Sequence, residues 1–307
     1  MVNIGFIAGF IILVFILLIA SLSGYFSEKA GIINLSIEGY MCFGAIMYAL
    51  IINKFKMLDL GINQLFIMLL AGFITLVIGL SYAMMVLIFK ANQTIVGIAI
   101  NALVIAISYF LIKETGVSNY LDVQSQFYSF GDYTNWGYLF NSTIILGLPL
   151  FLLGIIFIHK TKIGKLIKGV GENPEAIESI GYKVWVLQLI AILISSFLGG
   201  IAGSFFAQTS ATFYGSVNGI GFIAVAIVIF GQWKILYICI GSIFFGIFLN
   251  FAIYHGQLPD LIRTVLPVDL IPMFPFVFGI LSMVALSFIT KSNAPAALGK
   301  PYVRKGR

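Results

Sequence analysis

The chain of 307 residues is 61% hydrophobic and only 9% charged, with 17 basic against 11 acidic residues. Average soluble domains are ~45–50% apolar and ~25% charged, so the composition argues against a water-soluble enzyme and excludes a disordered chain, which would have low hydrophobicity. Cys42 and Cys239 both lie in apolar runs, which argues against a disulfide scaffold or a thiolate metal site. A polytopic membrane protein remains.

Nine charge-poor runs approach the ~20 apolar residues that a helix needs to cross a membrane. They cover residues 4–26, 32–52, 65–89, 95–112, 143–158, 184–207, 219–230, 235–254 and 270–289. We predict an all-α, polytopic transmembrane bundle of about 8–10 spans that forms a single domain over residues 1–307. The first run is predicted to be a retained span because no basic residue precedes it, as one would in a signal peptide.

Basic residues gather in two segments, and cytoplasmic loops carry such an excess. The loop 160–183 holds five lysines against three glutamates, and the tail 290–307 holds five basic residues and no acid. The loop 113–141 instead holds three acids and one lysine. We therefore predict that the loop 160–183 and the C-terminal tail are cytoplasmic and that 113–141 is external. The basic excess is an orientation signal, so no nucleic-acid partner is needed to explain it.

A polar cluster opens the second run. Glu38 lies where membrane is expected, a costly position for a carboxylate, and Asn34 and Ser36 precede it. Flanking glycines, among them Gly39, permit an unwound or sharply turned backbone, and discontinuous helices of this kind build binding sites in many transporters. We therefore predict a broken or re-entrant segment. The alternative is an interfacial Glu38 with the helix proper starting at Tyr40.

The fourth run also carries amides. Gln93 and Asn101 are eight residues apart, so they lie about 80° from each other on a helix, toward one face. A buried Asn in a span commonly hydrogen-bonds a neighbouring helix, and contact with solute is the other interpretation.

A Gly-x-x-x-G pattern at Gly199 and Gly203 predicts close helix packing in the sixth run. Gln208 follows at the end of the same run and is a candidate to face a cavity.

The loop 160–183 contains the local signals of a short helix over 174–180. Asn173 is a good N-cap, Pro174 suits the first helical position, and Gly181 can end the helix in left-handed geometry. Two interpretations are open: an interfacial amphipathic helix, or a docking element for a cytoplasmic partner.

The sequence contains no phosphate-binding Gly-x-x-x-x-Gly-Lys-Ser/Thr motif, so the chain is not expected to hydrolyse ATP by the Walker route. His159 and His255 are isolated, and the serines lack a partnering base, so neither a metal site nor nucleophilic catalysis is indicated. We predict a non-catalytic chain without a cofactor.

Four stretches resemble one family of bacterial ABC-transporter permeases, in family order from residue 27 to 307. They read SEKAGIINLSIEGYMCFGA, VGENPEAIESIGYKV, GFIAVAIVIFGQWK and APAALGKPYVRKGR. The family is the branched-chain amino acid/ribose superfamily, in its nucleoside or simple-sugar importer type. Ile235 departs from its pattern, which often has Pro there.

The resemblance implies a permease subunit in the bacterial plasma membrane. It would work with a cytoplasmic ABC ATPase, a second homologous permease and an external substrate-binding lipoprotein, amid membrane lipid. Together with the residue patterns above, it indicates a substrate pathway at Asn34, Ser36, Glu38, Gly39, Gln93, Asn101 and Gln208. It indicates coupling to the ATPase at Gly171, Glu172, Asn173, Pro174, Glu175, Ala176 and Gly181.

The alternative function is an ion-gradient-driven secondary transporter of a small polar solute, which would also use broken helices. Proton-coupled carriers usually place acids or histidines in several spans, whereas Glu38 is the one candidate in this sequence. A faint internal echo joins the stretch from Asn34 to Gly39 with that from Asn218 to Gly221, since each opens an apolar run. It would fit a duplicated half.

Overall fold

The computed structural model describes residues 4–57, 64–115, 121–122, 141–210, 212–253 and 293–302, with a few positions between 270 and 284. The loop 113–141, which is predicted to be external, and the last predicted run, 270–289, lie mostly outside the described residues. The helices are α1 (Ile4–Lys29), α2 (Ile37–Met57), α3 (Gln64–Ala83), α4 (Gln93–Glu114), α5 (Ser142–Lys160), α6 (Lys162–Glu172), α7 (Pro174–Ser179), α8 (Val184–Thr209), α9 (Ile220–Phe230) and α10 (Ile235–Ile253). A π-helical turn, η1 (Met84–Ile88), extends α3, and two short strands, β1 (Leu121–Asp122) and β2 (Thr212–Phe213), pair antiparallel.

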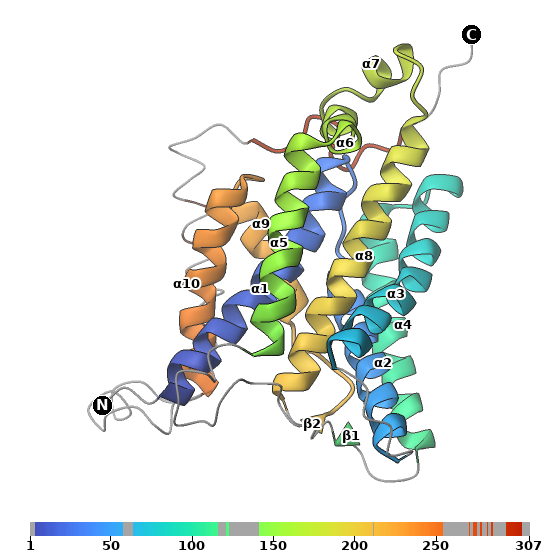
Figure 1. Cartoon of the computed structure of the whole chain (residues 1–307). Helices are drawn as coiled ribbons and strands as arrows, with labels where there is room; N and C mark the ends of the chain where they lie inside the picture. Colours follow the sequence, from blue (N-terminus) through green and yellow to red (C-terminus); the bar gives the residue numbers. More distant parts are fainter. Residues whose placement is uncertain are drawn as a thin grey trace.

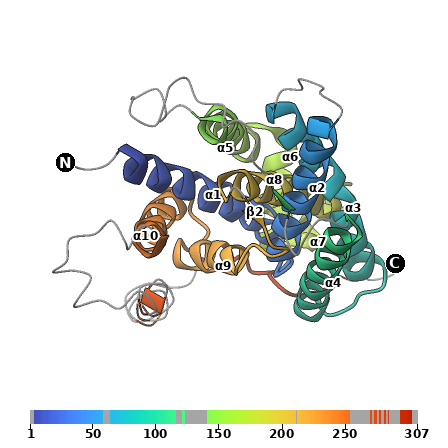
Figure 2. The same cartoon turned by 90° about the horizontal axis from the view of Figure 1, so that it is seen from below.

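The predicted all-α membrane bundle is confirmed. Within the described residues, six helices are long and apolar enough to cross a membrane: α1, α3 with η1, α4, α5, α8 and α10. Helices α1 and α8 form the centre, with α9 and α10 on one side and α3 and α4 on the other (Figures 1 and 2). Helices α6 and α7 lie together at one end of the bundle, and the paired strands lie at the opposite end (Figure 1).

Small residues let α8 approach α2 closely. A Cβ on Gly203 would lie 2.6 Å from the carbonyl carbon of Met41, and one on Gly199 would lie 2.8 Å from the Cβ of Tyr40. Because lipid tails are as apolar as the side chains, such close contact, with its van der Waals attraction, drives helix association in a membrane.

Two helices begin after non-helical segments inside the bundle. After α1 the chain turns at Gly31, which has a φ of +83°, and stays non-helical until α2 begins at Ile37. The first part of the predicted run 32–52 is therefore non-helical, and the helix begins three residues before Tyr40. From Ile37 it continues unbroken for 21 residues, about 31 Å, and both re-entry and the depth of Glu38 stay predictions. After α8 the chain again leaves the helix, and α9 follows with 11 residues, about 16 Å, well short of the ~30 Å hydrocarbon core.

The loop 160–183 holds two helices where the sequence pattern indicated one. Helix α7 begins and ends close to the predicted 174–180, and the Asn173 side chain accepts the amide N–H of Ala176 as its cap. The preceding α6 was missed because it contains three glycines, which disfavour helix. Packing offsets that cost: a Cβ on Gly164 would lie 2.6 Å from the Cα of Ile158 in α5.

Candidate functional site

The start of the long helix α2 meets the start of the short helix α9 inside the bundle. Glu38, the second residue of α2, is only 2% exposed. Its Oε1 accepts the N–H of Gly219 at 2.8 Å, and its Oε2 accepts the N–H of Gly221 at 2.7 Å. The first N–H groups of a helix have no partner within it and carry partial positive charge. One carboxylate therefore satisfies the start of α9 while lying in the first turn of α2.

Helix α4 holds the other side of this contact. The Asn101 Oδ1 accepts the N–H of Gly39 at 2.8 Å, and its Nδ2 donates to the carbonyl of Leu35 at 2.8 Å. Gly97, one turn earlier, leaves room for the non-helical stretch, since a Cβ there would lie 3.1 Å from the Cβ of Leu35. Both hydrogen-bonding capacities of the amide are thus used on the backbone at the start of α2.

A local turn completes the start of α2. The Asn34 Oδ1 accepts both the backbone N–H and the hydroxyl of Ser36, at 3.1 and 2.5 Å. Its Nδ2 donates to the hydroxyl of Ser195 in α8 at 3.0 Å, and Ser195 also contacts Ser23 in α1. We call Asn34, Ser36, Glu38, Gly39, Asn101, Gly219 and Gly221 the break junction.

Two of the predicted pathway residues lie outside the break junction. Gln93 is adjacent to it, because its Oε1 accepts the N–H of Ile33 at 2.8 Å. Gln208 is remote: it accepts from Ser142 at 2.7 Å and donates to Gln64 at 2.8 Å. It follows Ser195 by 13 positions along α8, which is about 20 Å.

The structure thus gathers five of the seven predicted residues into one hydrogen-bonded unit, in which each is buried. Their contact with solute stays a prediction. Sequence reasoning missed Ser195 as a partner, although its position before the glycine pair was visible. Gly221 was indicated only by the faint echo between the two runs, and the structure brings the starts of these runs into contact.

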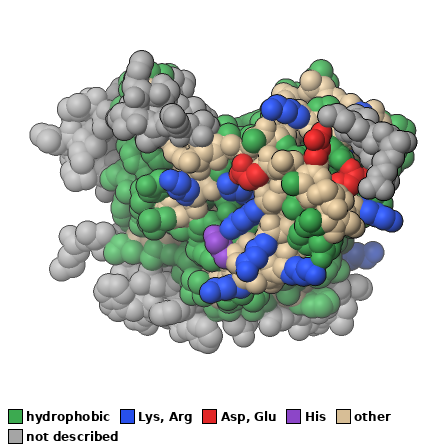
Figure 3. All heavy atoms as spheres, turned by 90° about the horizontal axis from the view of Figure 1, so that it is seen from above, with side chains coloured by type: hydrophobic (Ala, Val, Ile, Leu, Met, Phe, Trp, Pro, Cys, Tyr) green, Lys and Arg blue, Asp and Glu red, His purple; other side chains and the backbone are tan. Residues whose placement is uncertain are grey.

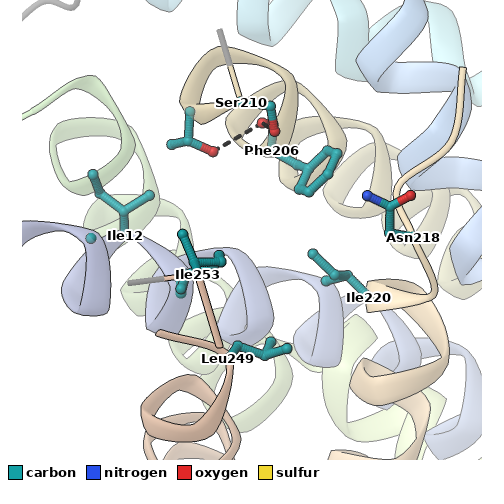
Figure 4. Close-up of a pocket in the computed structure, with 10 residues that line it drawn as sticks. Ile12, Phe206, Ser210, Asn218, Ile220, Leu249 and Ile253 are labelled. Atoms are coloured by element: carbon teal, nitrogen blue, oxygen red, sulfur yellow. Dashed lines mark hydrogen bonds between the residues drawn. The ribbon is translucent and has the colours of Figure 1, made fainter. Parts of the chain in front are cut away.

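A cavity of about 440 Å³ lies between α1, α8, α9 and α10, within the size range of small-molecule sites (Figure 4). Its wall is largely apolar, with three polar residues. The lining residues are Gly9, Ile12, Leu13, Phe206, Thr209, Ser210, Asn218, Ile220, Leu249 and Ile253.

The break junction supports one wall of this cavity. Asn218 and Ile220 line it, and Gly219 between them donates its N–H to Glu38. Asn218 has a φ of +55°, and its backbone N–H donates to the Ser216 hydroxyl at 3.1 Å. In Figure 4 its amide lies across the cavity from Ile12. Glu38 therefore fixes the backbone at Gly219, next to the exposed side-chain amide of Asn218 that lines the cavity.

The predicted coupling residues lie at the opposite end, in and beside α6 and α7. Glu172, Asn173, Glu175 and Ala176 are exposed, and no residue of α7 is buried. Gly181 follows α7 with a φ of +91°, in the left-handed conformation.

The C-terminal segment 293–302 binds this end together. The Ala297 N–H donates to the Gly171 carbonyl at 2.8 Å, and the Gly299 N–H donates to the Gly31 carbonyl at 3.0 Å. Lys90 donates to the Tyr302 carbonyl at 2.9 Å, and the Tyr302 hydroxyl donates to Glu178. The tail therefore links α6 and α7 to the break after α1, a role that its sequence did not reveal.

Apolar spanning helices, a short helix α9 whose start meets that of α2 inside the bundle, and a cavity beside this contact are typical of a multi-pass membrane transport protein. The chain belongs to the family described as the permease component of the branched-chain amino acid transport system, which it matches over residues 6–286. The resemblance found in the sequence motifs is thereby confirmed. The chain is therefore a transport component. No solved structure matches it.

Named relatives match it along nearly their whole length. The guanosine ABC transporter permease protein NupQ of Bacillus subtilis is 31% identical, over 95% of this chain and 94% of its own. The nucleoside ABC transporter permease protein NupC of Lactococcus lactis is 29% identical, over 94% and 93%. The putative glucose ABC transporter permease protein TsgC13 of Haloferax volcanii is 27% identical, over 94% of each chain.

Proposed function

We propose that the chain is the transmembrane permease subunit of an ABC importer that moves nucleosides inward, driven by ATP hydrolysis on a separate subunit. The observation that supports this solute class is the similarity, over more than nine-tenths of each chain, to two permeases named for guanosine and for nucleosides.

The solute path passes the cavity beside the break junction. A nucleoside combines a flat base with several hydrogen-bonding groups, and Phe206 offers an apolar face while Asn218 offers both a donor and an acceptor. Glu38, Asn34, Ser36, Gly39 and Asn101 act as positioning residues that hold the starts of α2 and α9, with Gln93 beside them. Gln208 acts at the far end of α8.

Energy enters at α6 and α7, which dock on a cytoplasmic ABC ATPase. The exposed residues 172–176 supply the contact, and the capped α7 moves as one body because Asn173 fixes its start. The tail segment 293–302 transmits that movement to Gly31 and so to the break. This end and the C-terminus are therefore cytoplasmic, and the loop 113–141 is external.

Two further partners follow from this function. An external binding lipoprotein delivers the solute, and a second homologous permease pairs with this chain. Large apolar side chains exposed on the outer faces of α3 and α4, such as Phe73, Ile95 and Phe110, are covered by that permease or by lipid. The whole chain forms one permease domain, without a resident cofactor or a nucleic-acid partner.

A simple sugar is the second candidate solute, favoured by the similarity to the putative glucose permease. The ion-gradient carrier is disfavoured by the family to which the chain belongs.

Uptake by proteoliposomes containing the complete complex tests the proposal. Labelled guanosine should accumulate with ATP, unlabelled nucleosides should compete, and ribose and glucose should not. Competition by sugars alone would favour the second candidate. Uptake that persists with a catalytically dead ATPase would contradict the ABC mechanism. Replacing residues 172–176 by a flexible linker should abolish uptake while the chain still inserts, and unchanged uptake would contradict the docking role.

A further inference from the structure

A second cavity, of about 460 Å³, lies at the end of the bundle that carries α6. Four of its lining side chains are basic or imidazole groups that come from different parts of the chain: Lys29 at the end of α1, His159 in α5, Lys168 in α6 and Lys234 just before α10. Figure 3 shows this face of the molecule, with Lys side chains gathered around the His side chain. Three distant segments thus contribute lysine to one hollow.

Positive charge is in excess around this cavity. Glu172 is the one acid among its described lining residues. Within the described part of the chain, none of the three lysines forms an ion pair within 4.0 Å. Lys29 is attracted by Glu172 and repelled by Lys168, and burial lowers the pKa of Lys168. Three ammonium groups beside a single carboxylate leave a net positive potential that attracts an anion.

Behind the cavity wall, the carboxylate of Glu28 already accepts a hydrogen bond. Glu28 is buried, and its Oε2 accepts the indole N–H of Trp233 at 2.5 Å. Trp233 lines the cavity whereas Glu28 does not. This pair therefore shapes the wall and does not neutralise the lysines, of which Lys234 lies over the ring of Tyr237, 5.4 Å from its centroid.

An exposed apolar stripe runs from the cavity along α10. Leu236 lines the cavity and is 68% exposed, and Ile240, Ile243 and Ile247 are also exposed. Spacings of four, three and four residues place all four on one face of the helix. Charge at one end of an apolar stripe matches an amphipathic ligand better than a free, fully hydrated phosphate.

We propose that this cavity binds the phosphate headgroup of an anionic phospholipid, with the acyl chains lying along the α10 stripe. The three lysines contact the phosphate oxygens, and Tyr25 and Trp233 contact the glycerol region. Because Lys168 belongs to α6, a bound lipid joins α6 to α1 and to the start of α10. The site would therefore stabilise the ATPase-facing end of the permease, whichever solute is carried.

Native mass spectrometry of the purified full-length chain tests the inference, with phosphatidylglycerol and phosphatidylcholine as probes. Phosphatidylglycerol should be retained more strongly, and each Lys→Gln change at Lys29, Lys168 or Lys234 should weaken its binding about fivefold. A matched control replaces Lys160, Lys165 and Lys183, which are exposed on the same end of the molecule outside the cavity. It should leave binding unchanged.

Three outcomes would overturn the site. Equal losses in the control variant would mean only diffuse attraction, and equal retention of phosphatidylcholine would mean no headgroup selectivity. Protection from thermal unfolding by glycerol phosphate or inorganic phosphate, at concentrations matching phosphatidylglycerol, would assign the site to a free anion. If the Lys29→Gln or Lys234→Gln variant does not fold, Lys168→Gln alone decides, because this partly exposed side chain is held by no hydrogen bond to a described residue.

Discussion

Helices α2 and α9 start with different chemistry. At the start of α2, neutral amides and hydroxyls satisfy the backbone: Asn101 from α4, and Asn34 with Ser36 from the chain itself. At the start of α9, a single carboxylate does so, and it comes from α2. Side chains of α4 therefore hold the start of α2, and a side chain of α2 in turn holds the start of α9 at the cavity wall.

This asymmetry has a mechanical consequence. Hydrogen bonds to a charged group are about twice as strong as those between neutral groups, so the contact of α2 with α9 should outlast the contact of α2 with α4. Helices α2 and α9 are then expected to move as one body, whereas α4 can shift relative to them. Substitutions at Glu38 and at its partners test whether the two contacts differ in strength in this way.

Gly221→Ala should have the largest effect. Its Cβ would lie 2.5 Å from the backbone nitrogen of Glu38, so the two backbones must separate and both carboxylate hydrogen bonds are lost. We expect the free energy of unfolding to fall by about 3–6 kcal/mol, measured by denaturant titration of the purified chain in mixed micelles. A loss below about 1 kcal/mol would contradict the direct contact of α2 with α9.

Glu38→Ala should rank second. It leaves two buried N–H groups at the start of α9 without an acceptor, a loss of about 2–5 kcal/mol in the same titration. Glu38→Gln retains one acceptor and should lose less than half as much. If Glu38→Gln is as stable to denaturant as the wild-type chain, the carboxylate charge has no special role. Uptake by the complete complex should fall in both, because Asn218 loses its support.

Asn101→Ala should rank third, with a loss of about 1–3 kcal/mol, because it leaves one neutral N–H and one carbonyl at the start of α2 unsatisfied. The same unfolding titration measures it. An effect larger than that of Glu38→Ala would reverse the proposed order of the two contacts.

Gly219→Asn should have the smallest effect and serves as the control for Gly221. Its φ of +82° is one that Asn tolerates, and nothing lies within 4 Å of a Cβ built there. We expect a change in the free energy of unfolding within about 1 kcal/mol, with Glu38 still bound to the same N–H. Destabilisation comparable to that of Gly221→Ala would mean that the contact of the Gly221 Cβ with Glu38 does not explain the loss in that variant.

Sequence patterns predicted the structure correctly where neighbouring residues determine it. The cap at Asn173 and the left-handed Gly181 predicted α7 because both act within a few residues. Helix α6 escaped prediction for the opposite reason. Its glycines are unfavourable in an isolated helix and become useful only where Gly164 and Gly171 press against α5 and α1.

Hydrophobic runs, charges and caps act over short distances, so a membrane bundle, a polar break around Asn34 and Glu38, and a capped helix at the basic end could be predicted from the sequence. The role of the break depends on packing between distant segments. The partners of Glu38 lie 181 and 183 positions away, and no local pattern marks a backbone N–H as unsatisfied until another helix approaches it. The same holds for the lysines of the basic cavity, which packing alone draws together from α1, α6 and the start of α10.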